Sequence, residues 1–173
     1  MAITIVPLAR EHRALLKAFR NQHVSLTEYL QRYALRHATK DLLARTFVAL
    51  DRVDDALAIA GYFSLAPTSL ERASVTPLPS LDRLPRFPIP GVLLARLAVD
   101  SRVQGQGLGR YLFEQALGLT LQLAKTGPVT FRIFVTDAID GAAVKFYQRF
   151  GLTRLGSEFP CRMAMDIAPL LAA

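Results

Sequence analysis

The sequence predicts one α/β domain built on a mixed β-sheet. The order of the segments indicates this fold, because it ends strand–helix–strand–helix–strand, and a strand–helix–strand crossover makes two parallel strands neighbours. Size supports it, since 173 residues with 51% hydrophobic residues suit one domain with a full core. We therefore expect a single domain over residues 1–173, with six to seven strands and about four flanking helices.

The first half of the chain supplies strands and two helices. Hydrophobic periodicity separates the two types of segment. Ser25 is expected to cap the second helix, with Glu28 completing a capping box. The elements expected are a strand over 3–6, helices over 11–20 and 25–38, and strands over 46–50 and 57–65 joined by an acidic turn over 51–55.

The second half begins with a proline-rich segment over residues 66–90. Its six prolines exclude a regular helix or a central strand and predict a long ordered loop beside the substrate. Asp140 can cap the last helix and Gly151 can end it. The elements expected are strands over 91–99, 129–135, 153–155 and 162–167 and helices over 108–125 and 141–150, with the strands near 93–99 and 129–135 parallel.

Three glycines alternate after the strand over residues 91–99, at Gly105, Gly107 and Gly109. Glycine lets a backbone approach a ligand closely, and the free amides that open a helix attract phosphate. The segment lacks the Lys-Ser or Lys-Thr pair of a P-loop, and no acid follows at the spacing of a dinucleotide fingerprint. The pattern Gln104-x-x-Gly107-x-Gly109 predicts a site for a phosphorylated cofactor. A tight turn that binds nothing is the alternative.

Basic residues outnumber acidic ones, giving a formal net charge of +7. Residues 10–45 hold three acidic residues and eight basic ones, which are Arg10, Arg13, Lys17, Arg20, Arg32, Arg36, Lys40 and Arg45. Such an excess favours anionic partners such as nucleic acid. A general preference of this chain for arginine explains the cluster equally well.

The glycine pattern resembles the pyrophosphate loop of the GNAT acetyltransferases, Q/R-x-x-G-x-G/A. The resemblance implies acetyl-coenzyme A as the acetyl donor and a sheet splayed between its two parallel strands. It also implies that the backbone of Leu97 and Val99 binds the pantetheine arm, while loop amides and nearby arginines bind the pyrophosphate. The cofactor residues so implied are Leu97, Ala98, Val99, Arg102, Gln104, Gly105, Gln106, Gly107, Leu108, Gly109 and Arg110.

A second motif contains Tyr147. Ala143, the Phe146-Tyr147 pair and Gly151 resemble the A-x-x-F-Y-x-x-x-G-F segment of the same family, with Leu152 in place of its last Phe. Tyr147 is the candidate acid for the departing thiolate, because an ordinary tyrosine pKa near 10 keeps it protonated. A purely structural tyrosine is the alternative.

The strand over residues 92–99 holds no carboxylate, and Arg96 is its only charged residue. An α-amino group, with a pKa near 7.7–8.0, is partly neutral at pH 7, whereas a lysine amine near 10.4 is not. The missing base therefore favours an α-amine as the acceptor. Arg96 either binds a phosphate or the 3′ end of the acceptor, or pairs with an acid such as Asp137.

A narrower resemblance, to the GNAT toxins of type II toxin–antitoxin modules, covers nearly the whole chain. It lies in FRNQHVSLTEYL at 19–30, GYFSL at 61–65, PIP at 88–90 and LARLAVD at 94–100. The chain departs from the toxin pattern at Asn21-Gln22, where a Cys-Gly pair is usual, and at Tyr29, where a Trp is usual. The resemblance implies acetylation of the α-amino group of aminoacyl-tRNA, which blocks translation, and implies an antitoxin of the ribbon-helix-helix type and a homodimer. Acetylation of a small-molecule amine or a protein N-terminus is the alternative.

The remaining features narrow the class of protein. The absence of a long apolar run excludes a membrane span, and Cys161, the only cysteine, is expected in the core of a cytoplasmic protein. The three histidines lack metal-ligand spacing, so we expect no metal site. Surface or capping roles are expected for them.

Overall fold

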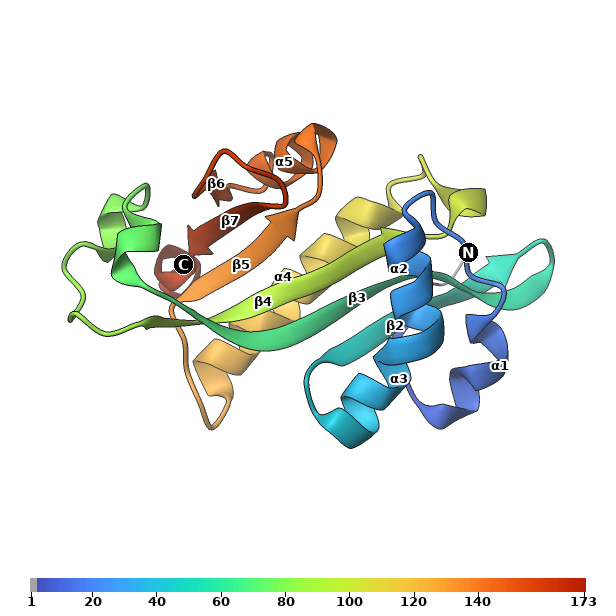
Figure 1. Cartoon of the computed structure of the whole chain (residues 1–173). Helices are drawn as coiled ribbons and strands as arrows, with labels where there is room; N and C mark the ends of the chain where they lie inside the picture. The colour runs from blue at the N-terminus through green and yellow to red at the C-terminus, as the bar shows by residue number, and fades with distance from the viewer. Residues whose placement is uncertain (1–2) are drawn as a thin grey trace. The chain divides into compact units, whose positions relative to one another are not determined.

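The computed structural model describes residues 3–173 (Figure 1). Within these residues seven strands form one sheet in the order β1-β2-β3-β4-β5-β7-β6. The strands are β1 (Thr4–Pro7), β2 (Arg45–Val53), β3 (Ala56–Leu70), β4 (Ile89–Val99), β5 (Ile133–Ala138), β6 (Thr153–Arg154) and β7 (Cys161–Asp166). The helices are α1 (Arg13–Leu16), α2 (Val24–Glu28), α3 (Ala34–Arg36), α4 (Leu108–Thr126), α5 (Gly141–Gln148) and α6 (Ala168–Leu171). The prediction of a mixed sheet of six to seven strands is confirmed.

Short helical turns complete these elements. Two π-helical segments, η2 (Tyr29–Tyr33) and η3 (His37–Asp41), continue α2 and α3, so that the chain is helical from Val24 to Asp41. The 3-10 turns are η1 (Arg10–His12), η4 (Arg72–Val75), η5 (Pro79–Leu81) and η6 (Ser101–Val103). No helix within residues 3–173 is long and apolar enough to cross a membrane.

The chain divides into two compact units. The first unit is Met1–Ala66 with Ala95–Ala116, and the second is Pro67–Leu94 with Leu117–Ala173. Strand β4 and helix α4 each begin in one unit and end in the other. The single domain over residues 1–173 remains a prediction.

The first unit contains the antiparallel hairpin of β2 and β3. Its turn is only two residues long, at Asp54 and Asp55, where φ is +51° and +63°. Two positive φ angles match the right-handed twist of a hairpin, and aspartate tolerates this conformation. The strands therefore extend further than expected, and the acidic turn predicted over 51–55 shortens to its last two residues.

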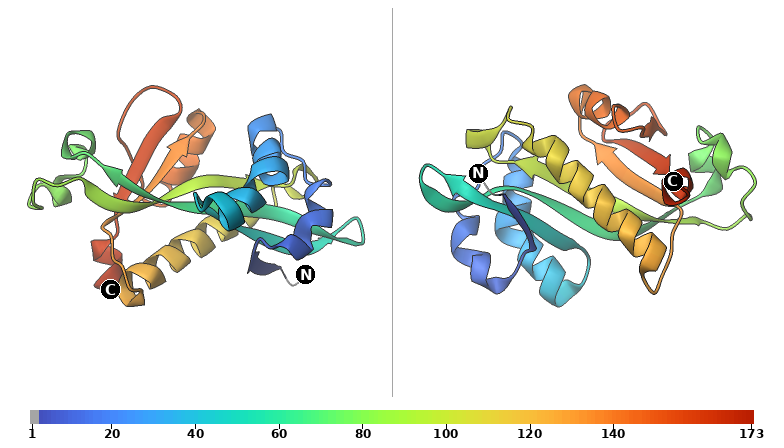
Figure 2. Two further views of the ribbon diagram at one scale, coloured as in Figure 1. Left: turned by 60° about the horizontal axis from the view of Figure 1, so that its bottom comes forward. Right: turned by 180° about the vertical axis from the view of Figure 1, so that it is seen from behind.

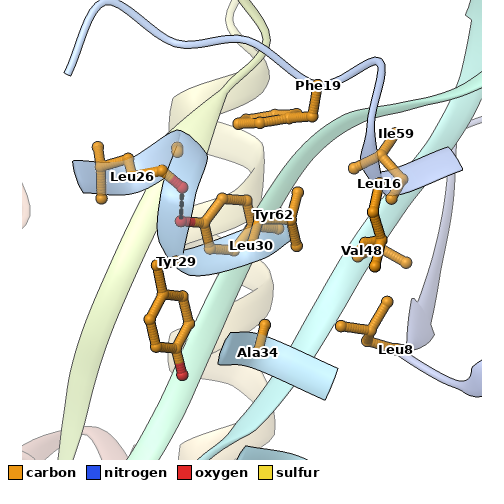
Figure 3. Packing of buried hydrophobic residues seen from close by; sticks show 11 residues of the cluster. Leu8, Leu16, Phe19, Leu26, Tyr29, Leu30, Ala34, Val48, Ile59 and Tyr62 are labelled. Atoms are coloured by element: carbon orange, nitrogen blue, oxygen red, sulfur yellow. Dashed lines mark hydrogen bonds between the residues drawn. The ribbon is translucent and has the colours of Figure 1, made fainter. Parts of the chain in front are cut away.

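Helices α1 to α3 cover one face of this hairpin (Figures 1 and 2). Phe19 and Tyr62 meet edge to face at 5.4 Å, and the Tyr62 hydroxyl donates to the carbonyl of Leu26 at 2.6 Å (Figure 3). Burial raises the pKa of Tyr62 well above its usual value. The buried cluster comprises Leu8, Leu16, Phe19, Leu26, Tyr29, Leu30, Ala34, Val48, Ile59, Tyr62 and Ala98.

The helix predicted over residues 11–20 needs correction, whereas the helical region predicted over 25–38 is confirmed and runs from Val24 to Asp41. The first helix is only a 3-10 turn and one α-turn, and His12 Nδ1 caps its start by accepting from the amide of Ala9 at 3.0 Å. The second begins at Val24 with His23 as its N-cap and no side-chain cap. The capping box predicted at Ser25 is therefore wrong. Asn21 instead organises the turn before the helix, accepting from the amide of His23 at 2.9 Å.

The first turns of α4 lie on the opposite face of β3. A Cβ built on Gly61 would approach Leu112 Cδ1 to 2.7 Å and the carbonyl oxygen of Ala98 to 2.9 Å. Glycine is therefore required at this position by close packing. The helix prediction for 108–125 is confirmed by α4, which begins at the predicted residue.

The second unit holds the predicted parallel pair. Gly91–Leu94 of β4 pairs in parallel with Ile133–Thr136 of β5, and β4 itself continues to Val99. The parallel ladder covers only Gly91–Leu94 of β4, which fits the splayed sheet that the family resemblance implies. Strand β5 begins four residues later than predicted, and in the stretch before it the Thr130 hydroxyl donates to the carbonyl of Ala124 at 3.1 Å.

The proline-rich segment folds onto this sheet. Its apolar side chains Val75, Leu78 and Leu81 pack into a buried cluster with Ile133 and Val135 of β5. The absence of a regular α-helix over 66–90 is confirmed. The exclusion of a central strand is wrong at both ends, because β3 extends through Pro67 to Leu70 and β4 begins at Ile89. The position of this segment beside a substrate remains a prediction.

Helix α5 and strand β7 complete the second unit. Asp140 Oδ1 accepts from the amide of Ala143 at 2.8 Å, and Gly151 has φ of +91°, so the predicted cap and stop of this helix are confirmed. Cys161 is buried and free, as expected of a core residue. Arg132 binds Asp166 through two hydrogen bonds of 2.6 and 2.9 Å.

Candidate active site

The glycine loop connects β4 to α4 within the first unit. Gly105 and Gly107 have φ of +77° and +82°, in the left-handed region. Among residues 3–173, leaving out chain neighbours, no atom lies within 4 Å of a Cβ built at either glycine. Gly109 lies in the first turn of α4. The two preceding glycines thus satisfy a backbone requirement and leave open space beside a helix N-terminus, as a phosphate cradle needs.

Asp100 holds the start of this loop in place through hydrogen bonds. Its side chain is fully buried and accepts hydrogen bonds from the amides of Arg20 and Arg102, both at 3.0 Å. The Arg102 guanidinium also binds it, at 2.8 and 3.1 Å. Burial by itself raises the pKa of Asp100, but the bonds from Arg102 and Arg20 outweigh it and hold this pKa below its usual value. Asp100 therefore fixes the start of the loop as a carboxylate.

The two arginines predicted to bind pyrophosphate are both paired with acids. Arg102 is bound to Asp100, and Arg110 Nε donates to Glu114 Oε1 at 2.8 Å. Their net contribution of positive charge at the loop is therefore smaller than the sequence suggested. Backbone amides are the main donors that the loop offers to an anion.

The carbonyl of Val99, predicted to bind pantetheine, already accepts two hydrogen bonds. Asn21 Nδ2 donates to it at 2.8 Å and Gln104 Nε2 at 3.3 Å. A ligand amide at this carbonyl must displace one donor, and the longer bond from Gln104 is the weaker of the two. Asn21, which stands where the toxin pattern has Cys, thus ties the first helical region to the end of β4.

Arg96 lies on β4 with its guanidinium over the Tyr29 ring, 4.7 Å from the centroid. A cation over an aromatic face is held electrostatically while its outer N–H groups stay available. Asp137, the acid suggested as its partner, is bound instead by Arg162 through two hydrogen bonds of 2.8 Å. The stacked, exposed Arg96 keeps its capacity to bind an anion.

Tyr147 is buried on α5 in the second unit. Burial raises its pKa to about 12, and a hydrogen bond with Thr136 offsets part of this rise. The hydroxyl of Thr136 donates in turn to the carbonyl of Leu94 at 2.9 Å. Tyr147 is therefore protonated at neutral pH, as a general acid must be, and burial makes it a weaker acid than a free tyrosine.

Three positioning residues were missed by sequence reasoning. Asp100 follows an apolar strand and precedes the glycine loop, which is a signal that could have identified it. Asn21 and Thr136 carry no such signal, because their partners are backbone carbonyls distant in sequence. No group of three or more His, Cys, Asp or Glu side chains within residues 3–173 is suited to hold a metal.

Comparison with known proteins assigns the family. A family model described as acetyltransferase (GNAT) domain matches residues 43–153, which include the whole glycine loop and Tyr147. The chain belongs to the GNAT acetyltransferases. The predicted family is therefore confirmed, and with it the class of enzyme.

Similar proteins within this GNAT family include a tRNA-acetylating toxin of Mycobacterium tuberculosis (strain ATCC 25618 / H37Rv). It is 32% identical over 133 residues, which cover 77% of this chain and 75% of the toxin. A structure of AtaT complexed with acetyl-methionyl-tRNAfMet matches with a TM-score of 0.83, 22% identity and coverage of 98% and 97% of the two chains. A Tyr-to-Phe variant of AtaT, bound to the C-terminus of the antitoxin AtaR and acetyl-CoA, matches with a TM-score of 0.74, 22% identity and coverage of 97% and 95%. These structures share the fold of this GNAT chain.

Proposed function

We propose that this protein transfers an acetyl group from acetyl-CoA to the α-amino group of aminoacyl-tRNA and so blocks translation as a toxin. The observation that carries the proposal is the 32% identity to a tRNA-acetylating toxin over 77% of the chain. The strand β4 supports it, since it offers Arg96 and no carboxylate. An acceptor that is already partly neutral at pH 7 needs no strong base, and an α-amine meets this condition.

The glycine loop is the proposed site for the pyrophosphate of acetyl-CoA. Open space beside Gly105 and Gly107 and the amides before Leu108 suit a diphosphate. Leu97, Ala98 and Val99 are the proposed backbone partners of the pantetheine arm. The other proposed loop contacts come from Arg102, Gln104, Gln106, Gly109 and Arg110.

Acetyl-CoA supplies a thioester carbon that the amine nitrogen attacks. The N–C bond forms, the C–S bond breaks, and the departing thiolate requires a proton. Tyr147 is the proposed donor of that proton, and the amine releases its own proton to water. The tyrosinate left by this transfer takes a proton back from water, and the raised pKa of Tyr147 favours that return. Arg96 is the proposed contact for a phosphate near the acceptor's 3′ end.

The partners follow from the same relationship. We propose that a ribbon-helix-helix antitoxin holds this protein inactive, that the active form is a homodimer, and that it acts in the cytoplasm, where charged tRNA is found. A toxin with this activity must be restrained between periods of use. Size measurement in solution and co-purification with the product of a neighbouring gene test these proposals.

Acetyl transfer is tested with purified protein, labelled acetyl-CoA and a mixture of charged tRNAs. We expect label on the aminoacyl group, and we expect Tyr147→Phe to lower kcat by about 10²- to 10⁴-fold while acetyl-CoA still binds. Tyr111→Phe is the matched control, because it also removes one tyrosine hydroxyl and Tyr111 is partly exposed on α4. Its rate should equal that of the wild type.

Two results would overturn this proposal. One is the absence of label on every aminoacyl-tRNA, with label on a free amine or an N-terminal peptide instead. The other is an unchanged kcat in Tyr147→Phe, which would return Tyr147 to a structural role.

A further inference from the structure

A basic groove lies between the two N-terminal helical segments of the first unit, which run side by side in Figures 1 and 2. Its volume is about 820 Å³. We name it the basic groove by its six cationic lining residues, Arg10, Arg13, Lys17, Arg32, Arg36 and Lys40. All six are exposed. They are six of the 21 Lys and Arg residues of the chain, so the positive charge is concentrated here.

The six cations form two rows, one on each helical segment. Arg10, Arg13 and Lys17 are three and four residues apart, and the other row repeats every four residues. Such spacings put side chains on one face of a helix. Along an α-helix, residues four apart drift by about 40° per step. The wider π turns η2 and η3 oppose this drift, which keeps the second row facing the groove.

Gln31 holds the two segments together despite their like charge. Its Nε2 donates to the carbonyls of Lys17 and Phe19, at 3.3 and 3.0 Å. Beneath the rows, Leu16 and Leu35 belong to the buried cluster and its edge. The charges are therefore carried on a fixed frame.

Most of these cations have no acid to neutralise them. Arg36 binds Asp41 at 2.9 Å, and Arg32 lies 3.8 Å from Glu28. Among residues 3–173, Arg10, Arg13, Lys17 and Lys40 form no ion pair and no side-chain hydrogen bond. Four neighbouring unpaired cations repel one another, and an anion in the groove would relieve that repulsion.

We propose that the basic groove binds the phosphate backbone of RNA, as the docking surface for the tRNA acceptor, and this rests on the proposed function. Two facing rows of cations suit a chain of regularly spaced negative charges. Four of the six are arginines, whose planar fork matches a phosphate. An acidic protein segment is the rival occupant, but protein partners bind mainly through buried apolar or aromatic anchors. The groove offers only Leu16 and Leu35, so the observations favour RNA.

Neutralising two of the three cations in one row tests whether the groove binds RNA. The variant Arg13→Gln with Lys17→Gln removes two unpaired charges, and Arg52→Gln with Lys125→Gln removes two exposed charges outside the groove. The probe is fluorescent unacylated tRNA, with its affinity measured by anisotropy at several salt concentrations. Each lost phosphate contact lowers the slope of log affinity against log salt by about 0.9. We expect the groove variant to lose a slope of about 2 and the control pair to lose none.

Kinetics and a second probe separate the outcomes. The groove variant should raise KM for charged tRNA about tenfold or more with kcat unchanged, because contacts to the phosphate backbone that are equal in the ground and transition states act by uniform binding. An unchanged salt slope overturns the proposal. The second probe is a twelve-residue polyglutamate peptide. If the groove variant loses affinity only for this peptide and not for tRNA, the proposal is also overturned. If charged tRNA is never acetylated while tRNA binding still depends on the groove, the proposed function fails and this inference stands.

Discussion

The glycine loop and the basic groove both suit phosphate, yet they present positive charge in different ways. In the loop, Arg102 and Arg110 are paired with acids, and backbone amides remain as the donors. In the groove, four of the six cations form no ion pair with any acid of residues 3–173, and side chains supply the charge. We therefore expect the loop to select a ligand by shape and the groove to select one by charge.

This difference has a physical consequence for specificity. Backbone amides are fixed in place and recognise one diphosphate in one position, which suits a cofactor used in every turnover. Long side chains adapt to a large polyanion, and their attraction weakens as salt rises. Substitutions that change only the shape of the loop, or only the charge of the groove, therefore test whether the two sites bind phosphate in different ways.

The largest effect is expected from Gly107→Ala. A residue with a Cβ at φ of +82° costs about 1–3 kcal/mol, and the added methyl group enters the open space over the loop. We expect acetyl-CoA affinity to fall about 100-fold, as measured by calorimetry, while tRNA affinity stays the same. A parallel fall in the affinities for acetyl-CoA and tRNA would contradict the proposed difference between the loop and the groove.

Gly118→Ala is the matched control for that substitution. Gly118 lies exposed within α4, and no atom lies within 4 Å of its built Cβ, helix backbone and chain neighbours aside. Alanine there should stabilise the helix by about 0.5–1 kcal/mol and leave acetyl-CoA affinity unchanged. A loss of affinity in this control would mean that the helix, rather than the loop, determines binding.

The next effect is expected from Asp100→Asn, which removes the buried carboxylate beneath the loop. Arg102 loses its partner, although at 37% exposure its side chain is partly compensated by water. We expect the free energy of unfolding to fall by about 2 kcal/mol in urea titrations at pH 7. An equal stability of the two proteins would exclude Asp100 as the anchor of the loop.

The pH dependence of this difference has a definite sign. The pKa of Asp100 is lowered in the folded state, so its stabilisation is complete above the unfolded pKa near 3.9 and decreases as pH falls through the folded value. The stability gap between wild type and Asp100→Asn should therefore be constant above about pH 4 and shrink below it.

The smallest effect is expected from Arg110→Gln. Arg110 is exposed and already paired with Glu114, four residues away on the same helix, and such surface pairs contribute about 0.3–0.5 kcal/mol. We expect acetyl-CoA affinity to change less than about threefold, a far smaller effect than that of Gly107→Ala. A tenfold loss would show that side-chain charge matters in the loop as it does in the groove.

Local sequence signals predicted the elements that depend on local chemistry. The Asp140 cap, the Gly151 stop and the start of α4 were correct, because each depends on neighbours within a few residues. The cap at Ser25 failed, because Asn21 bridges to Val99 and forms the turn differently. The ion pair considered for Arg96 gave way to a ring contact with Tyr29, which periodicity does not reveal.

The sequence by itself determined the family, the crossover pair of strands and the glycine loop, since these are written in spacing and residue type. Only the tertiary structure decided which charges remain available. It paired Arg102 and Arg110 with acids, while four cations of the groove have no acidic partner in the described part of the chain. The physical reason is that a charge acts through the groups folded around it, and residues distant in sequence supply many of those groups.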